Sequence, residues 1–313
     1  MRASTLLFPG LCAAASLPRS CNASTCTSPS KRIEWRSLDE ATQKAYTDAV
    51  MCMTKKQSQP SLGLSTTLYD DFPYIHFNLD RDIHFVASFL PWHRYFVHLY
   101  EVQLRECGYT GPMSYWDWTL DVPDVPSSSI WDPVTGFGGN GQVPEPDSSL
   151  KCVADGPFKD LRPSYFGDAY EPHCLGRSFN NGTAEPGDMF QSIYTPAAVQ
   201  EILEASDYND FRIKLESGPH GAIHSAIGGD MSPATSPNDP IFFLHHGQID
   251  RLWWLWQQIE PEVRNKDFSG NRYQDDETVQ AALDDYMSFF GMADGIMVAE
   301  VMTTQNDLLC YTY

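Results

Sequence analysis

The spacing of the nine histidines limits the fold of this chain more than any other feature of its sequence. His220 and His224 are four residues apart, so a helix would place them one turn apart on a single face. His245 and His246 are adjacent, between an apolar run and a Trp-rich segment, where a plain core would contain leucine. A fold that uses these imidazoles must bring separate helices together around them.

A second group of histidines lies in the first third of the chain. His84 and His93 flank Pro91, whose ring disfavours helical geometry in the preceding residue, so we predict that a new helix starts there. His76 is expected on the loop just before. Each group can supply three imidazoles: His76, His84 and His93 in one, and His220 and His224 with either His245 or His246 in the other.

The chemistry of these groups points to a metal. Imidazole ligands suit zinc, copper, iron and nickel, and neither group has a carboxylate at ligand spacing. The Glu-x-x-His pairs of di-iron bundles and a His-Glu-x-x-His motif are both missing. Two all-histidine groups on packed helices favour two copper ions that face one another. On spacing alone, a catalytic zinc held by three histidines and hydrogen-bonded histidines without metal stay open as alternatives.

Helical periodicity predicts a mainly α fold, a helical bundle with long irregular loops and little β structure. Helices are expected at 38–53, 82–107 on either side of Pro91, 196–206, 208–227, 239–259 and 276–290. A loop is expected up to about residue 74, and 122–195 is dense in Pro, Gly, Ser and Asp without a sustained period. Such a long irregular stretch usually covers something functional. Because helices and loops share one set of histidines, we predict a single domain.

Charge and hydropathy exclude two classes of partner. The net charge of −20 argues against nucleic acid and against an anionic membrane surface, since both need a basic face. No stretch approaches the ~20 apolar residues that span a bilayer.

The N-terminus and the cysteines indicate secretion. Residues 1–15 contain one Arg, an apolar run and three alanines, so we predict a signal peptide followed by a mature domain at 16–313. Seven cysteines follow residue 15, so disulfides are expected in an oxidising compartment, with one cysteine left over. Asn22 and Asn181 begin glycosylation sequons, as in a secreted glycoprotein.

The histidine motifs resemble those of the tyrosinase, catechol oxidase and haemocyanin family, and most of all the short, single-domain fungal polyphenol oxidases. The resemblance covers nearly the whole mature chain. It is carried by "HFNLDRDIHFVASFLPWHRYFVHLYEVQL" (76–104), "ESGPHGAIH" (216–224), "SPNDPIFFLHHGQIDRLWWLWQ" (236–257), "YWDW" (115–118) and the closing "YTY".

The resemblance implies a binuclear centre with two copper ions as cofactors. One copper would be bound by His76, His84 and His93, and the other by His220, His224 and His246; His245 would then support the site without binding metal. Asp250, four residues after His246, is expected to accept the proton of the non-coordinating nitrogen of that histidine. Phe242, one turn before His246, should pack against the ligand rings.

The family's activity implies a copper-dependent oxidase that uses O2 to convert an o-diphenol into an o-quinone. Some members first hydroxylate a monophenol, with an Asn directly after the first histidine of the second site and a nearby Glu that together position a water. Gly221 occupies the Asn position here, while Glu216 is placed to be the carboxylate. We therefore expect diphenol oxidation to exceed monophenol hydroxylation.

Two further positions are compared with the family pattern. Some members link a cysteine to the second copper ligand through a thioether; here Asp82 occupies that position, so His84 should be unlinked. The tyrosines of the closing YTY are expected to contact Arg32 by stacking or hydrogen bonding. The family's C-terminal shielding domain is not expected, so the enzyme should be active without proteolysis.

Other functions stay in view. A haemocyanin-like oxygen-binding protein would share the copper cage without phenol turnover, and a zinc hydrolase would use the same histidines. Within the oxidase class, tailoring of a fungal secondary metabolite and pigment formation both fit. The expected partners are a small phenol and O2.

Overall fold

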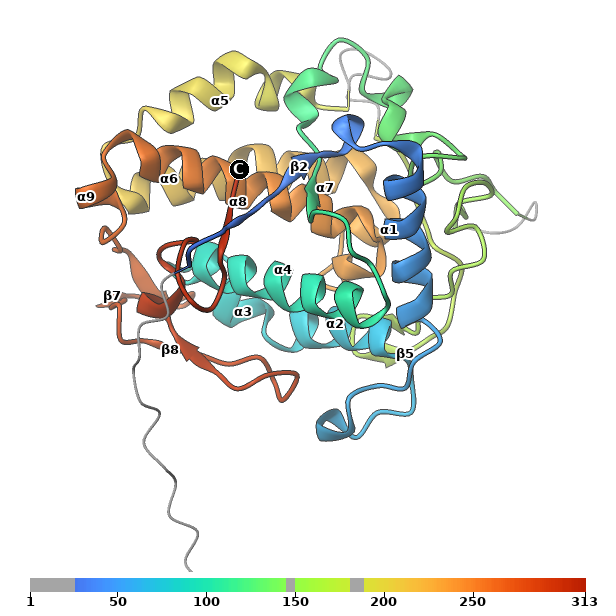
Figure 1. Ribbon diagram of the computed structural model, residues 1–313, viewed down its shortest axis with the longest axis horizontal. Coiled ribbons are helices and arrows are strands. Elements are labelled where there is room, and N and C mark those ends of the chain that lie inside the picture. Colours follow the sequence, from blue (N-terminus) through green and yellow to red (C-terminus); the bar gives the residue numbers. More distant parts are fainter. Residues whose placement is uncertain (1–25, 145–149, 181–188) are drawn as a thin grey trace, which may run out of the picture.

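Two long helices, α4 (Phe89–Glu106) and α8 (Ile241–Ile259), pack against each other in the middle of the molecule (Figure 1). Their contact includes a face-to-face stack of Tyr100 and Phe243, with ring centroids 3.4 Å apart. Burial of one such aromatic ring contributes about 1.5–3 kcal/mol to stability. This computed structural model describes residues 26–144, 150–180 and 189–313.

The other helices surround this pair. They are α1 (Glu40–Met53), α2 (Leu68–Asn78), α3 (Asp80–Ile83), α5 (Pro196–Leu203), α6 (Tyr208–Leu215), the π-helical turn η7 (Glu216–His220), α7 (Gly221–Ile227) and α9 (Pro261–Arg264). The fold is therefore mainly α, as predicted. Within the described ranges, no helix is long and apolar enough to cross a bilayer.

The β structure of the described chain is limited to short two-stranded pairs. They are β1 (Ser30–Lys31) with β10 (Tyr311–Thr312), β2 (Ile33–Glu34) with β3 (Ser114–Tyr115), β4 (Tyr165–Phe166) with β5 (Ala169–Tyr170), β6 (Asn271–Tyr273) with β7 (Asp276–Gln280), and β8 (Tyr286–Met287) with β9 (Ile296–Met297). The first two pairs are parallel and join segments far apart in sequence.

Two helix predictions need correction. The loop predicted up to about residue 74 ends earlier, because Thr67 and Asp70 form a reciprocal capping box that starts α2 at Leu68. His76 consequently lies on a helix instead of a loop. The helix predicted at 276–290 is wrong: β7 pairs with β6 in an antiparallel hairpin, and β8 follows.

The remaining helix predictions are confirmed to within a few residues. Pro91 lies in the first turn of α4, where its missing N–H leaves no hydrogen bond unmade. The segment predicted at 208–227 is divided into α6, η7 and α7, with a kink at Gly218, whose dihedrals are non-helical. In its described parts, 122–195 contains 3-10 turns, the β4–β5 hairpin and isolated β-bridges of Cys152 with Gln142 and Gly176.

Three disulfides form, as expected from the cysteine count: Cys26–Cys310, Cys52–Cys107 and Cys152–Cys174. The first joins the two ends of the described chain next to the β1–β10 pair. The predicted signal peptide at 1–15, Cys21 and both sequon asparagines, Asn22 and Asn181, lie outside the described residues.

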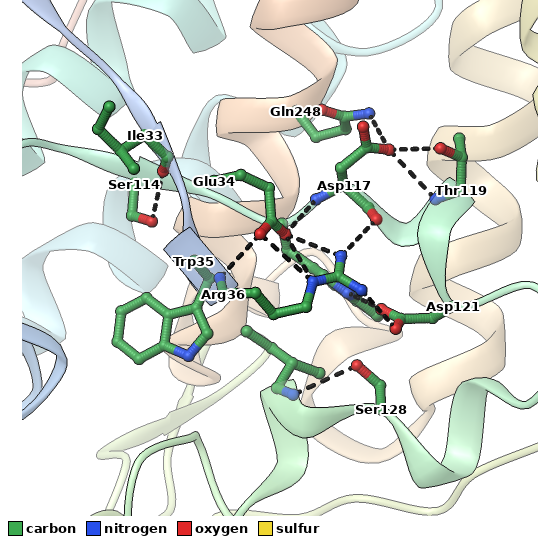
Figure 2. Close-up of polar contacts among 12 residues, drawn as sticks. Ile33, Glu34, Trp35, Arg36, Ser114, Asp117, Thr119, Asp121, Ser128 and Gln248 are labelled. Carbon is green, nitrogen blue, oxygen red and sulfur yellow. Dashed lines mark hydrogen bonds and ion pairs between the residues drawn. The ribbon is translucent and has the colours of Figure 1, made fainter. Parts of the chain in front are cut away.

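An arginine-centred cluster fixes the aromatic segment 114–121 against the centre of the fold (Figure 2). The guanidinium of Arg36 donates to the Glu34 carboxylate, to the carbonyl of Asp117 and, at 2.7 Å, to the Asp121 carboxylate. The side chain of Asp117 in turn accepts a bond from Gln248 on α8. These bonds hold the segment beside the helix that carries the adjacent histidine pair.

Candidate metal centre

Three helical elements bring the first group of histidines together. His76 comes from α2, His93 from α4, and His84 from the position directly after α3. One ring nitrogen of each lies within 4.8 Å of the others, and we call this set cluster A. The break that the sequence predicted between His84 and His93 is what turns both rings toward the same point.

The second group also assembles at one point. His220 ends η7, His224 lies one turn later in α7, and His245 and His246 come from α8. Ring nitrogens of all four lie within 4.8 Å of one another, and we call this set cluster B.

The clusters face each other across a narrow gap. His93 of cluster A stacks on His246 of cluster B with ring centroids 4.4 Å apart and planes 14° apart. The rings of His84 (cluster A) and His220 (cluster B) are also stacked, with centroids 6.2 Å apart. Two three-coordinate ions could therefore lie side by side, each held by its own cluster.

Backbone carbonyls fix the orientation of five of these rings. In each case the ring Nδ1 bonds a carbonyl oxygen at 2.6–3.1 Å. The pairs are His76 with Ala234, His84 with Asp80, His93 with Phe89, His220 with Glu216, and His224 with Met231. A carbonyl only accepts, so Nδ1 carries the proton and Nε2 is left with a free lone pair. This second bond is the usual support of a metal-binding histidine.

Pairs of Nε2 atoms lie close together within each cluster. In cluster A, Nε2 of His76 and His93 are 3.1 Å apart, and in cluster B, Nε2 of His224 and His246 are 3.4 Å apart. Nε2 of His220 is buried without a hydrogen-bond partner. At His76 and His93 both Nδ1 atoms donate to carbonyls, so two Nε2 lone pairs are directed at each other, which is unfavourable unless a cation binds them. The residues thus fit a pair of imidazole-bound metal ions, and copper suits this donor set.

Electrostatics keep five of the cluster rings neutral and ready to bind metal. Burial and neighbouring histidines hold the pKa values of His76, His93, His220 and His246 well below the usual range. Burial lowers the pKa of His224 to about 4, against its bond to the Met231 carbonyl. A metal ion therefore displaces no proton from these rings at neutral pH.

The structure distinguishes the two adjacent histidines. The indole Nε1 of Trp118 lies 3.3 Å from Nδ1 of His245, and an indole nitrogen can only donate. His245 must therefore accept at Nδ1 and carry its proton on Nε2, which removes the lone pair that a metal would need there. His246 has no such contact, and its Nδ1 is buried without a partner.

Aromatic side chains wall the gap. The ring centroid of Phe242 lies 4.1 Å from that of His246 and 5.1 Å from that of His76. Phe242 therefore packs against a ring of each cluster, as its position one helical turn before His246 predicted. Phe89, which the sequence reasoning missed, lies 4.9 Å from His93 and 4.8 Å from His220. Phe89 could have been predicted from the sequence, because it precedes His93 by four residues and so lies on the same face of the helix.

Glu216 and Gly221 lie on either side of His220. Glu216 is buried; its Oε1 accepts the backbone N–H of Phe85 at 2.6 Å, and its Oε2 accepts from Arg212 at 3.2 Å. Burial raises the pKa of Glu216, against its hydrogen bond to Phe85 and the charges of His84 and Arg212. Gly221 begins α7, and a Cβ placed on it would meet only the Glu216 carbonyl at 3.5 Å, an ordinary contact.

The contact predicted between Asp250 and His246 is wrong. The Asp250 carboxylate accepts from Arg94 at 2.5 Å, Arg32 at 3.0 Å and Tyr313 at 2.5 Å, and also from Tyr311. Two buried guanidinium groups are stronger partners for a buried carboxylate than a neutral imidazole. Asp250 therefore anchors α8 in the fold without touching the ring of His246.

The predicted contact of Arg32 with the closing tyrosines is confirmed. Its guanidinium lies 3.5 Å from the ring centroid of Tyr311 and donates to the hydroxyl of Tyr313 at 3.0 Å.

The other two histidines of the described chain lie apart from both clusters. His98 stacks on Tyr95, and His173 bonds Asp230 at 2.9 Å.

Comparison with known proteins identifies the family. The model of the common central domain of tyrosinase matches residues 66–259, which include the histidines of both clusters. The chain belongs to the tyrosinase family. It is 43% identical over 310 residues to tyrosinase-like protein phomQ1' of Diaporthe leptostromiformis, covering 92% of this chain and 80% of that protein. It is 40% identical over 293 residues to tyrosinase ustQ of Aspergillus flavus, with coverage of 92% and 80%.

Solved structures agree with this membership. A variant of the polyphenol oxidase from Thermothelomyces thermophila superposes with a TM-score of 0.78 at 30% identity, covering 91% of this chain and 88% of that one. A functional unit of octopus haemocyanin shares the fold alone, with a TM-score of 0.51 at 22% identity over 74% of this chain and 54% of that one. This chain is thus a tyrosinase-family oxidoreductase of the binuclear copper class.

Proposed function

We propose that this protein oxidises small phenols with O2, converting o-diphenols into o-quinones. Two diphenols would be oxidised for each O2, which is reduced to two waters. The observation that carries the proposal is the pair of histidine clusters whose Nε2 atoms converge from opposite sides of one gap.

We assign His76, His84 and His93 to one copper, and His220, His224 and His246 to the other. When bound, the two coppers supply the redox chemistry toward O2. The protein orients five of the six rings through backbone carbonyls, and burial lowers the pKa values of the five rings at positions 76, 93, 220, 224 and 246. Two of the six histidines, His84 and His224, are partly exposed, and we propose that a phenol approaches from their side.

Diphenols should be better substrates than monophenols. A monophenol must lose its proton before it is hydroxylated, and a base or a positioned water assists that step. Glu216 is the proposed water-holding group, while Gly221 offers no side chain to share the task. Phe242 and Phe89 give the gap apolar walls against which an aromatic ring can pack.

The chain is proposed to act outside the cytosol. Three disulfides in the described chain are typical of proteins from an oxidising compartment. Tailoring of a fungal secondary metabolite and pigment formation both use this chemistry, and turnover against a panel of mono- and diphenols distinguishes them.

The test is copper content combined with oxygen consumption. The purified protein should contain two coppers per chain and consume O2 when catechol is added. Alanine at any of the six assigned histidines should abolish turnover and leave the far-ultraviolet circular dichroism unchanged. Reversible O2 binding without catechol turnover would identify an oxygen-binding protein instead, and stoichiometric zinc would identify a different metalloenzyme.

A further inference from the structure

Two of the five ring-orienting carbonyls come from a single loop. His84, His93 and His220 each bond a carbonyl four residues earlier. His76 and His224 instead bond Ala234 and Met231. Both carbonyls belong to the segment 228–240 between α7 and α8, which we call the connecting loop. This loop therefore orients one histidine of cluster A and one of cluster B, each at 2.6 Å.

One buried carboxylate ties the connecting loop together. Asp230, which directly precedes Met231, accepts from Asn238 at 3.1 Å through Oδ1, so it joins the two ends of the loop. Its Oδ2 accepts the N–H of Gly176 at 2.6 Å, and its own N–H donates to the carbonyl of Gly176 at 2.9 Å. The carboxylate thus fixes the loop internally and against the segment 171–178.

His173 completes this arrangement from the far side. Its Nε2 lies 2.9 Å from Oδ1 of Asp230, and its Nδ1 lies 2.7 Å from the carbonyl of Glu171. Both partners accept only, so both bonds form only when the imidazole carries two protons. The next residue, Cys174, is held by its disulfide to Cys152, which limits the movement of this segment.

The loop has little freedom to slide against the segment 171–178. Gly229 has a φ of +56°, and a Cβ there would lie 2.2 Å from the carbonyl of Gly176. Gly228 has a φ of +63°, and a Cβ there would lie 2.5 Å from the carbonyl oxygen of Ser178. Only glycine allows this close approach. A small shift of the segment 171–178 is therefore transmitted to the connecting loop.

We propose that Asp230 and His173 are positioning residues that set the geometry of both copper sites at once, through the connecting loop. The proposal rests on the histidine assignment given under the proposed function. Neither residue touches a cluster histidine through its side chain in the described contacts. They act by fixing the carbonyls of Met231 and Ala234, which in turn fix the rings of His224 and His76. Loss of the group that hydrogen-bonds a metal-binding histidine commonly weakens metal affinity about 10–100-fold, and displacement of these two carbonyls should have the same effect.

A pH effect follows from the charge of His173. Burial would lower its pKa, but the hydrogen bond and charge of Asp230, with a backbone bond and the charge of Glu171, raise it. The ring of Phe166 packs edge-on against His173 and carries no charge. As pH rises through the raised pKa, the imidazole loses one proton and the charge-assisted bond to Asp230 weakens. The loop should then hold both coppers less tightly.

The test compares copper release from Asp230→Ala, His173→Gln and Asp121→Asn proteins with release from wild type. Asp121 is the matched control, because it is a buried carboxylate that joins two segments, through Arg36 and Trp116, at 2.7 Å each. A competing chromophoric chelator reports the affinity of each copper, and thermal unfolding of each metal-free variant reports general damage. His173→Gln, which lies nearer the surface, carries the test if Asp230→Ala fails to fold.

We expect both coppers to be held at least tenfold more weakly in the two test variants, and with unchanged affinity in Asp121→Asn. Wild type should release copper faster as pH rises through the His173 pKa, and His173→Gln should be fast at every pH. Wild-type protein that takes up two coppers, with test variants that hold both normally or lose only one, would overturn the proposal. Wild type that never takes up two coppers would instead refute the histidine assignment, and the proposal with it.

Discussion

Glu216 accepts the backbone N–H of Phe85 at 2.6 Å, although the two residues are 131 positions apart. Phe85 directly follows His84 and has a φ of 56°, a left-handed conformation that costs a residue with a side chain about 1–3 kcal/mol. The carboxylate that we propose to hold a catalytic water therefore also fixes the backbone beside a copper ligand. The two roles can be separated by experiment.

Glu216→Gln should lower kcat/KM for monophenols at least tenfold more than for diphenols, because only the monophenol needs a base for its first step. The matched control is Arg212→Gln, which loosens the same carboxylate without removing it. The control should lower both rates in proportion. Equal losses for both substrates in Glu216→Gln would assign Glu216 to positioning alone.

Gly221→Asn should raise the ratio of monophenol to diphenol turnover severalfold by adding an amide next to Glu216. The helical backbone at Gly221 and the 3.5 Å clearance for a Cβ mean that the variant should fold. Gly221→Ala is the control, since it adds the Cβ without the amide. A ratio that rises equally in both variants would mean that helix stiffening, rather than the amide, changes the activity.

His245→Gln should retain two coppers, whereas His246→Gln should retain one. A glutamine carbonyl can still accept the indole N–H of Trp118, so the first variant keeps the contact that the structure shows. Elemental analysis of the purified variants measures the difference. One copper in His245→Gln and two in His246→Gln would reverse our assignment of the adjacent pair.

Asp250→Asn should lower the free energy of unfolding by about 3–5 kcal/mol, the usual cost of breaking a buried ion pair. The change leaves Arg32 and Arg94 buried without their shared carboxylate. Asp48→Asn is the control, because its ion pair with Lys44 is exposed and should contribute less than about 1 kcal/mol. Chemical denaturation measures both; a small effect at Asp250 would mean that the tyrosine hydroxyls alone hold α8 in place.

The metal-free protein should lose stability as pH falls from 6.5 toward 4. Five of the assigned ligands, His76, His93, His220, His224 and His246, have lowered pKa values and are neutral in both the folded and the unfolded state above pH 6.5. Below pH 6.5 the unfolded chain binds protons at these positions, whereas the buried rings do not. For His224, a pKa lowered from the usual 6.5 to about 4 corresponds to about 3 kcal/mol.

Thermal unfolding at a series of pH values measures this loss, and bound copper should move it to lower pH. His98 provides a control outside the clusters, since burial also lowers its pKa to about 4. In His98→Gln, unfolding should take up one proton fewer, so stability should depend less steeply on pH. Bound copper should still move the loss of stability to lower pH, as in the wild type. A metal-free protein equally stable at pH 6.5 and pH 4 would mean that the clusters accept protons freely.

The sequence was most informative where periodicity and spacing are local. Helices α1 and α8 and the break before α4 follow from apolar spacing and from Pro91, and the pairing of His220 with His224 follows from one helical turn. The hairpin that replaces the predicted helix at 276–290 depends instead on the β6–β7 pairing, a tertiary choice that overrides local pattern.

The contacts around the site were the least predictable. Asp250 was assigned to His246 because the two share a helical face, but its actual partners come from residues 32, 94, 311 and 313. The carbonyls of Met231 and Ala234 have no sequence signal at all, since every residue has a carbonyl. Trp118 beside His245 likewise depends on how a distant segment packs against α8.

Residues from both ends of the described chain surround the Asp250 carboxylate, and this affects the order in which the protein can fold during synthesis. Helix α8 carries a buried carboxylate whose arginine partners are made early and whose tyrosine partners are made about sixty residues later. Until those tyrosines leave the ribosome, the charge cannot be fully enclosed and α8 cannot reach its final packing on α4. The two histidine clusters should therefore come into register only after residue 313 has left the ribosome, so copper is expected to bind after that point rather than when α8 has just emerged.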